Sequence, residues 1–345
     1  MEPIRAIPTL ADVARKAAVS TATVSRFLNY PNQLSQITRE RVMSAIAELG
    51  YAPNFNAQAL AARRTHTVGA IIPTMDNAIF ARGLQAFQEE LGKLGKTLIV
   101  ASSSYSPELE FEQIRTLIAR GADGLLLIGY HRNPKIYSFL KQRNVPVLIA
   151  WAYQADTNQI SIGFNNEKAI RVLAKKVISL GHKSIGFISA PTKENDRAFD
   201  RVAGVRISMQ TAGLDPYNLQ LIETPYSIEN GRGAFKKLIN QKVPPTVVMC
   251  GNDVLAMGAL KQAKEMKLSV PNHISITGFD DIELASLAEP ELTTVHVPHR
   301  VMGKIAARML GDMMNYKKVK SRELAAELRF RGTLAPPRVL TTYKP

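Results

Sequence analysis

The ten residues STATVSRFLN, from Ser20 to Asn29, decide how the amino-terminal part of the chain folds. Val24, Phe27 and Leu28 recur at helical spacing and predict one buried stripe. The remaining positions of this helix carry only small or hydrogen-bonding side chains. A helix that gives up so much packing surface is suited to lie against another molecule.

Two further helices flank this stretch. TLADVARKA, residues 9–17, has four apolar residues at helical spacing after Thr9, which can cap the helix. A third helix is predicted over residues 38–49, with Thr38 as its cap and Gly50 at its end. Two helices joined by a turn of three or four residues match the helix-turn-helix, whose second helix enters the DNA major groove. The alternative is an ordinary three-helix bundle with a solvated face.

The outer face of the second helix has the chemistry that groove entry needs. Arg26 can form two hydrogen bonds to a guanine edge or bind a phosphate, and Thr21 can bond to either. Ala22 can touch a thymine methyl group or allow close approach, and Ser25 adds a further hydrogen-bonding group.

Composition limits the class of protein. The 345 residues, 46% of them hydrophobic, predict two or three folded units. No apolar run reaches the ~18 residues of a membrane span, and MEPIRAIPTL does not read as a secretory signal, so we expect a cytosolic protein without membrane contact. The net charge of +15 makes a polyanion a plausible partner, but residues 1–65 hold only 8 basic against 4 acidic side chains. The single cysteine, Cys250, is expected to be buried.

From Val68 onward, short apolar runs alternate with amphipathic helices. Strands are predicted at residues 68–72, 97–101, 124–128, 147–149, 184–189, 219–224, 246–250 and 274–278, and helices near 80–91, 107–120, 134–143, 165–180, 197–212, 228–240 and 253–266. This alternation indicates parallel sheets covered by helices on both faces. The stretch WAYQADTNQI, residues 151–160, interrupts it and suggests two sheets of similar size with a cleft between them. Ligands of such sheets bind at the carboxyl ends of the strands.

The stretches TLADVARKAAVSTATVSRFLN and YAPNFNAQALAARRTHTVG, residues 9–29 and 51–69, resemble the headpiece and hinge of the lactose-repressor family. The resemblance covers essentially the whole chain, and GFNN and AIF are similar to the gluconate-repressor branch. It implies an all-α helix-turn-helix headpiece followed by an α/β core of two doubly wound parallel-sheet subdomains, like that of periplasmic sugar-binding proteins. The implied units are a headpiece (1–53), a hinge helix and linker (54–66), a core N-subdomain (67–163 and 294–323) and a core C-subdomain (164–293 and 324–345).

The resemblance also implies how DNA is held. In the family the hinge forms a helix when a dimer binds its operator, and a leucine, Leu60 by position here, wedges into the minor groove. The predicted DNA-binding residues are Thr9, Ser20, Thr21, Ala22, Thr23, Ser25, Arg26, Asn29, Asn54, Ala57, Leu60 and Arg63. The expected partners are double-stranded operator DNA and a second copy of the chain.

The family's effector contacts match several positions of the core. Arg201, Asn252 and Asp280 stand where the family has effector-binding side chains, whereas Asp253 is expected to be a helix cap. Residues that follow predicted strands complete the predicted effector site: Ile79, Phe80, His131, Trp151, Asn195, Arg197 and Tyr226. Each aromatic residue could equally be core filling, and His131 could simply be solvated.

Two departures from the family bear on the effector. Trp151 replaces an acidic residue that neutral-sugar binders often have, and Arg197 adds a second cation near Arg201. More positive charge favours an anionic effector, a sugar acid or a phosphorylated sugar, over a neutral sugar. The resemblance thus implies a homodimeric transcriptional repressor of a carbohydrate or sugar-acid operon.

Two other classes of protein fit the sequence less well. A sugar-binding protein of a transport system would have to be exported, and the headpiece counts against it. An enzyme on a doubly wound sheet is disfavoured because no GxGxxG follows the first strand and no phosphate-binding loop or nucleophile elbow occurs. The six histidines show no metal-ligand spacing beyond the His296 and His299 pair, which a proline interrupts, so no metal or cofactor is expected.

Overall fold

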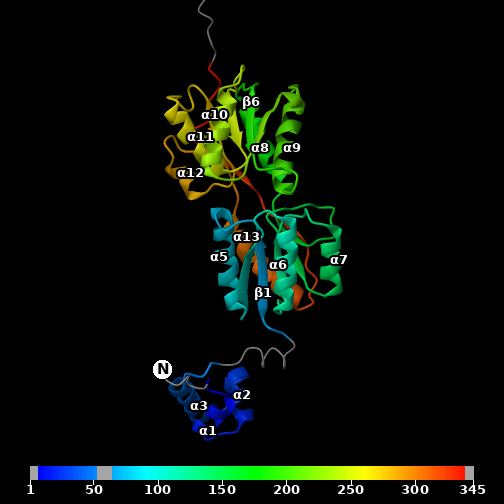
Figure 1. The fold of residues 1–345 in the computed structure, drawn as a ribbon, viewed down its shortest axis with the longest axis vertical. Coiled ribbons are helices and arrows are strands. Elements are labelled where there is room, and N and C mark those ends of the chain that lie inside the picture. Colours follow the sequence, from blue (N-terminus) through cyan, green and yellow to red (C-terminus); the bar gives the residue numbers. More distant parts are fainter. Residues whose placement is uncertain (1–6, 53–63, 339–345) are drawn as a thin grey trace, which may run out of the picture. The chain divides into compact units, whose positions relative to one another are not determined.

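The computed structural model describes residues 7–52 and 64–338. The chain divides into two compact units, one that ends at Thr65 and one that begins at His66, and each is described by itself (Figure 1).

The first unit is a small helical bundle. It contains α1 (Leu10–Lys16), α2 (Thr21–Asn29), the 3₁₀ turn η1 (Pro31–Gln33) and α3 (Gln36–Leu49). Val13, Val24 and Val42, one from each helix, are fully buried, and Phe27 and Leu28 pack against them. The three apolar stripes therefore meet in one core, as their spacing predicts.

Side-chain caps fix the ends of these helices. Thr9 and Asp12 form a reciprocal capping box at α1, and Ser20 caps α2. The expectation that Thr38 caps the third helix is wrong: Ser35 is the cap, and its Oγ accepts a hydrogen bond from the backbone N–H of Thr38. The helix begins two residues earlier than expected because the serine satisfies that amide.

The second unit contains a six-stranded parallel sheet, which we call the N-subdomain with its helices. The strand order is β11-β5-β4-β3-β1-β2. The strands are β1 (Thr67–Ile72), β2 (Thr97–Ser102), β3 (Gly124–Ile128), β4 (Val147–Ala150), β5 (Ser161–Gly163) and β11 (Arg322–Glu323). The helices are α5 (Ala78–Lys93), α6 (Pro107–Ala119), α7 (Pro134–Gln142) and α13 (His299–Met314).

Alternate residues of β1 cover the two faces of this sheet. Val68 and Ile72 pack in one cluster with Phe87 of α5, while Ile71 packs with Ile114 of α6 on the opposite face. Helices on both faces bury the inner strands β1, β3, β4 and β5, which explains their near-continuous apolar sequences, whereas the edge strands β2 and β11 are more exposed.

A four-stranded parallel sheet, ordered β7-β6-β8-β9, forms what we call the C-subdomain with its helices. The strands are β6 (Ile185–Ser189), β7 (Gln220–Glu223), β8 (Val247–Cys250) and β9 (Ser275–Thr277). The helices are α8 (Asn166–Ser179), α9 (Asp196–Thr211), α10 (Ile228–Ile239), α11 (Asp253–Glu265) and α12 (Glu283–Leu287), with the 3₁₀ turn η2 (Pro216–Asn218). Cys250 is fully buried, as expected.

Three chain segments connect the two sheets. The chain leaves the larger sheet after β5, returns through β10 (Thr294–His296) to α13, and leaves again after β11 through β12 (Glu327–Arg329), which pairs antiparallel with β10. The predicted strands and helices are confirmed. The sheets are less alike in size than expected, because β5 and β11 both join the first sheet.

Candidate functional site

The first candidate site is the outward face of α2. Ser20, Thr21, Ala22, Ser25, Arg26 and Asn29 are exposed, Thr23 is half-buried, and Thr9 is exposed at the start of α1. Two of these residues are tied to the helix: Ser20 Oγ lies 2.9 Å from Thr23 Oγ1, and Asn29 Nδ2 donates to the Ser25 carbonyl at 2.8 Å. The exposed face between these contacts carries only small or hydrogen-bonding side chains, which suits the major groove of DNA.

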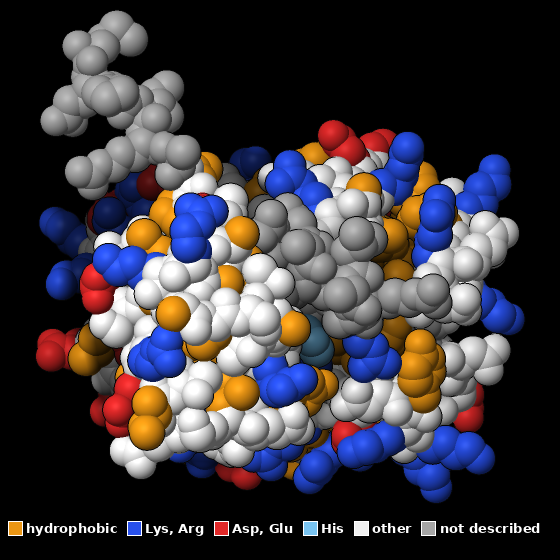
Figure 2. All heavy atoms as spheres, turned by 90° about the horizontal axis from the view of Figure 1, so that it is seen from below, with side chains coloured by type: hydrophobic (Ala, Val, Ile, Leu, Met, Phe, Trp, Pro, Cys, Tyr) orange, Lys and Arg blue, Asp and Glu red, His pale blue; other side chains and the backbone are white. Residues whose placement is uncertain are grey.

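Figure 2 shows Lys and Arg side chains spread over the visible surface rather than gathered in a single patch. The predicted hinge contacts Asn54, Ala57, Leu60 and Arg63 lie outside the residues that the structure describes.

The second candidate site is a cavity between the two sheets, at the carboxyl ends of their strands. Its volume is about 20 Å³ in this structure, and its lining consists of Asn77, Ile79, Phe80, Tyr105, Trp151, Phe164, Asn195, Arg197, Arg201, Tyr226, Asn252 and Asp280. The structure thus brings together all the predicted effector residues except His131. Apolar walls with a few converging polar groups are typical of small-molecule sites.

Arg201 is the central charged group of the cavity. Its guanidinium, from α9, donates to Asn166 Oδ1 and to Tyr226 Oη, both at 3.0 Å, and lies over the Phe279 ring. The side chain is buried, yet its Nε has no partner within the described part of the chain. A buried donor without an acceptor is costly, so the Arg201 Nε–H is suited to donate a hydrogen bond to a ligand oxygen.

Two further polar groups face the same space. Asn252 caps α11 through Oδ1, while its buried Nδ2 has no partner among the residues described. Asp280 is buried at a positive φ of 108°, and burial raises the pKa of its carboxyl to about 7, although Arg201 and Arg197 oppose the shift. The cavity therefore offers two unused donors beside a carboxyl that is partly protonated near neutral pH.

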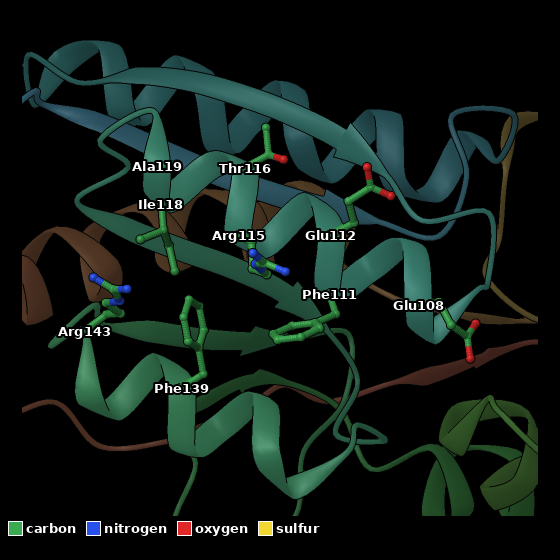
Figure 3. A pocket seen from close by; sticks show the side chains of 9 residues that line it. All are labelled: Glu108, Phe111, Glu112, Arg115, Thr116, Ile118, Ala119, Phe139 and Arg143. Atoms are coloured by element: carbon green, nitrogen blue, oxygen red, sulfur yellow. The ribbon is translucent and has the colours of Figure 1, made fainter.

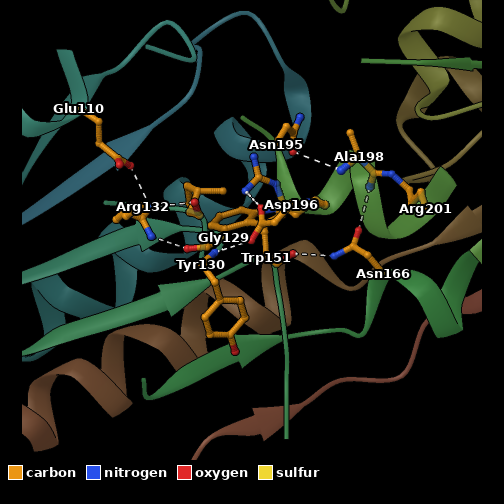
Figure 4. Close-up of polar contacts among 12 residues, drawn as sticks. Glu110, Gly129, Tyr130, Arg132, Trp151, Asn166, Asn195, Asp196, Ala198 and Arg201 are labelled. Carbon is orange, nitrogen blue, oxygen red and sulfur yellow. Dashed lines mark hydrogen bonds and ion pairs between the residues drawn. The ribbon is translucent and has the colours of Figure 1, made fainter. Parts of the chain in front are cut away.

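Arg197 and its neighbour Asp196 join the two subdomains. Asp196 pairs with Arg197 at 3.0 Å and accepts a hydrogen bond from the backbone N–H of Tyr130 across the cleft at 2.5 Å (Figure 4). Gly129 leaves the room for this pair, because a Cβ there would collide with the Arg197 guanidinium. The charge of Arg197 is thus balanced within the protein.

Trp151 forms the apolar wall on the opposite side. Its Nε1 donates to His299 Nδ1 at 3.2 Å, and its ring meets Phe80 edge to face at 5.4 Å. Burial lowers the pKa of His299 to about 3, so the imidazole is neutral and can accept this bond. Gly83 lies flat against the indole, where a side chain would not fit.

Two expectations need correction. His131 does not line the cavity: its ring is exposed and reaches Glu194 of the other subdomain at 3.1 Å, and neither residue belongs to the cavity lining. Asp253 is not a cap, because Asn252 holds that position. The Asp253 carboxylate is instead fully buried and accepts bonds from Thr294 Oγ1 at 2.6 Å and Ile282 N at 2.8 Å, which tie α11 to β10.

Sequence reasoning missed three lining residues. Asn77 precedes the predicted helix after β1, Tyr105 follows β2, and Phe164 lies in the GFNN stretch after β5. Each follows a strand of the same sheet, so applying the strand-end rule to every strand could have found them.

A larger hollow lies on the surface between α6 and α7 (Figure 3). Phe111 and Phe139 meet edge to face at 5.8 Å on its floor, with Arg115 over one ring and Arg143 over the other. Its walls come from neighbouring helices on one face of one sheet, and none of the buried donors without partners lies in it. The cavity between the subdomains is the stronger candidate.

Among residues 7–52 and 64–338, no group of His, Cys, Asp and Glu side chains is arranged to hold a metal ion. None of the helices described is both long and apolar enough to cross a membrane. Fold and sites together define a class: a helix-turn-helix unit joined to a two-subdomain α/β core with a small-molecule cavity.

Comparisons with known proteins agree with this class. Residues 9–54 match the family described as bacterial regulatory proteins, lacI family, and residues 174–334 match a periplasmic binding protein-like domain. The chain is 32% identical to catabolite control protein A of Priestia megaterium, over 91% of this chain and 94% of that protein. It is 30% identical to the transcriptional regulator GntR of Escherichia coli, over 88% and 91% of the two chains.

A solved structure of this family has the same fold. A lac repressor bound to ONPG in the repressed state superposes with a TM-score of 0.85 at 28% identity, covering 95% of this chain and all of that one. The chain therefore belongs to the lacI family of bacterial regulatory proteins. It is a DNA-binding transcriptional regulator with a ligand-binding type of core.

Proposed function

We propose that the protein is a homodimeric, cytoplasmic repressor of a carbohydrate or sugar-acid utilisation operon, controlled by a small effector in the cavity between the subdomains. The observation that carries the proposal is a pair of buried donors without a partner in the described chain, Arg201 Nε and Asn252 Nδ2, which belong to two residues that line this cavity. As members of this family are regulators, we propose that the protein acts by binding and not by catalysis.

The DNA-binding residues are proposed as in the sequence analysis. Thr21, Ala22, Ser25 and Arg26 read base edges, while Thr9, Ser20, Thr23 and Asn29 position the helix and contact phosphates. The hinge residues Asn54, Ala57, Leu60 and Arg63 belong to the same proposal and enter the minor groove when two subunits pair. A two-fold dimer then requires two half-sites related by two-fold symmetry.

We propose that the effector is an anionic sugar derivative, with a neutral sugar as the alternative. Because Asp196 balances Arg197, the cation left for a carboxylate is Arg201, whose counterpart Asp280 is partly protonated near neutral pH. A guanidinium fork binds a carboxylate well. Ile79, Phe80, Trp151 and Tyr226 supply apolar walls, and Asn195, Arg197 and Asn252 supply hydrogen bonds.

Regulation requires that the effector binds one conformation of the core better than the other. Cavity residues come from both subdomains, so a ligand there changes how the subdomains meet. We propose that this change reaches the hinge and alters the pairing of the two hinge segments.

The test is Arg201→Ala, with Arg206→Ala as its control, since Arg206 lies on the exposed side of the same helix. Full-length variants are assayed for binding to an operator selected from genomic fragments, with gluconate, glucuronate and glucose 6-phosphate as probes. We expect Arg201→Ala to bind operator but lose the response to the probe, and Arg206→Ala to retain both. A normal response in a folded Arg201→Ala protein would remove the cavity from the mechanism.

A further inference from the structure

Positively charged side chains follow one edge of the six-stranded sheet. All neighbouring strands of this sheet run parallel, so the loops that lead from a helix into a strand meet at the same edge. Four such loops, residues 94–96, 120–123, 143–146 and 315–321, hold six Lys or Arg side chains and a single acid, Asp123. We call the six cations the cationic edge: Lys96, Arg120, Arg143, Lys317, Lys318 and Lys320.

Comparable loops elsewhere in the core carry less net charge. At the opposite edge of the same sheet, the strand-to-helix loops 73–77, 103–106 and 129–133 together hold one cation and one acid. In the C-subdomain, the helix-to-strand loops 180–184, 212–219, 240–246 and 266–274 hold three cations and one acid. The effector cavity lies at the carboxyl ends of the strands, so the cationic edge is at the other end of the sheet and serves a different partner.

Most of these cations are not neutralised by the described chain. Lys96 is half-buried and the other five are exposed. Within residues 7–52 and 64–338, only Lys317 of the six forms an ion pair, with Asp312 at 2.8 Å. Asp123 is engaged elsewhere, because its carboxylate accepts a hydrogen bond from the backbone N–H of His66 at 2.8 Å. An exposed row of cations with few counter-charges attracts a polyanion.

The dimensions of the edge suit a nucleic-acid duplex. Neighbouring strands lie ~4.8 Å apart, so six strands extend over about 24 Å. A DNA duplex carries one phosphate charge per ~1.7 Å of its axis, which places about fourteen charges along that length. Lys96 and Lys317 line one surface hollow, whose acids Glu90 and Asp312 are both already in ion pairs. The loop 315–321 continues from this hollow to β11 at the far side of the sheet, so the cations form a row and not one compact patch.

Chain connectivity favours DNA as the polyanion. β1 starts at this edge, at the end of the N-subdomain that lies away from the C-subdomain (Figure 1). The helix bundle ends with α3 at Leu49, and residues 50–66 can span at most about 60 Å. A tether of this length gives a duplex bound by the bundle a high effective concentration at the cationic edge.

We propose that the cationic edge binds the sugar-phosphate backbone of the duplex that α2 reads. The contact is electrostatic and independent of base sequence, because Lys and Arg bind phosphates without reading a base. It assigns part of the DNA affinity to the core, outside residues 9–54 that match the lacI family. The inference rests on the proposed reading of DNA by α2, and it is independent of the proposed effector.

Fluorescence anisotropy of the full chain tests the proposal, with an operator selected from genomic fragments and an unrelated duplex of the same length. Lys318→Gln/Lys320→Gln removes two exposed charges from the edge. At about 100 mM salt we expect affinity to fall at least about five-fold on both duplexes, and the slope of log affinity against log salt to decrease by about 2.

Two matched variants separate the edge from net charge and from side-chain size. Lys236→Gln/Lys237→Gln removes the same charge from exposed positions of α10 and should leave both affinities and the slope unchanged. Lys318→Arg/Lys320→Arg keeps the charge and should bind both duplexes as the parent protein does.

The outcomes distinguish this proposal from the reading of DNA by α2. If Lys318→Gln/Lys320→Gln binds both duplexes like the parent, the edge has no role on DNA, while the test of α2 by Arg26→Ala is unaffected. A loss on the operator alone, or an equal loss in the α10 control, also overturns the proposal, because a phosphate contact is local and acts on all sequences alike. Should the Gln variant fail to fold by circular dichroism, Arg120→Gln removes one exposed charge from another loop of the edge and should lower the slope by about 1.

Discussion

At the scale of single residues, Asp280 shows how a binding group is kept ready at a cost in stability. The carboxyl is buried, and the residue has a positive φ, which few residues other than Gly, Asn and Asp adopt. Its hydrogen-bonding capacity is directed at the cavity, next to Arg201. Residues held in this way are typical of sites that are prepared for a ligand.

Asp280→Asn should change the pH dependence of stability. In the native state the pKa of Asp280 is raised to about 7, whereas the unfolded chain ionises near the ordinary value of 3.8. Between those values the native state holds the proton and the unfolded state does not, so the free energy of unfolding falls as pH rises, by up to about 1.4 kcal/mol per pH unit.

We expect Asp280→Asn to reduce this slope, and to raise the melting temperature relative to the parent protein above pH 7 but not at pH 4. Burial of Asp253 and Asp200 raises the pKa of each carboxyl in the same direction, so part of the slope remains. Thermal melts followed by circular dichroism from pH 4 to 8 measure it, with the exposed Asp76→Asn as control. An unchanged slope would show that Asp280 ionises normally.

Gly129→Ala tests the contact between the loop after β3 and α9. A Cβ at this position collides with Arg197 and Asp196, so the Asp196 bond to the Tyr130 amide should break. We expect effector affinity to fall about ten-fold or more, because the cleft no longer closes.

The variant Gly95→Ala isolates the cost of the backbone. Gly95 has a similar positive φ, 66° against 71°, but open space around it. Gly95→Ala should lose about 1 kcal/mol of stability and no effector affinity, whereas Gly129→Ala should lose more stability and effector affinity as well. Equal affinity in the two proteins would mean that this contact does not hold the closed cleft.

At the scale of elements, the sequence predicts the secondary structure well because local patterns determine it. Strands such as Gly124–Ile128 are buried on both faces, which makes them continuous apolar runs that periodicity detects. Helix ends are harder to predict. Both Ser35 and Thr38 are good caps, and only the backbone geometry around Ser35 decides between them.

Some residues of the effector site could be predicted from the sequence and others could not. Arg201 and Asn252 were predicted because they stand where the family has effector-binding side chains, and both line the cavity. His131 also follows a strand, but its side chain turns to Glu194 of the other subdomain, a contact that no local pattern contains. Tyr105 follows β2, so the strand-end rule indicates it, but its contact with Tyr226 of the other subdomain is a property of the assembled core.

The exposed face of α2 is predicted to bind the operator, and Arg26→Ala tests this prediction. Arg26 is exposed, so its loss should leave the melting temperature within about 1 °C. Operator affinity should fall by about 1–3 kcal/mol if Arg26 reads a guanine. If it contacts a phosphate instead, affinity falls on all sequences alike and the salt slope decreases by about 1.

Arg15→Ala is the matched control, because Arg15 is also an exposed arginine, lies on α1 and pairs with Asp12 of its own helix. Fluorescence anisotropy at several salt concentrations measures both variants. An affinity loss that is the same for Arg15→Ala and Arg26→Ala would reduce the role of α2 to general electrostatics.

At the scale of the whole molecule, binding DNA and binding an effector are tasks of separate units. Residues 7–52 form a bundle with its own core, and residues 66–338 form the two-subdomain core. An effector can change operator binding only if the segment between the two units responds to a change in the core. A ligand can then shift DNA affinity no further than its own preference between the two states of the core.

The most direct measurement is a hydroxyl-radical footprint of the full chain on an operator selected from genomic fragments, for the parent protein and for Arg26→Ala. We predict two protected half-sites related by a two-fold axis, with protection lost in Arg26→Ala at concentrations that saturate the parent. A footprint without two-fold symmetry, or one that Arg26→Ala reproduces at the same concentrations, would contradict a dimer that reads DNA through the lean face of α2.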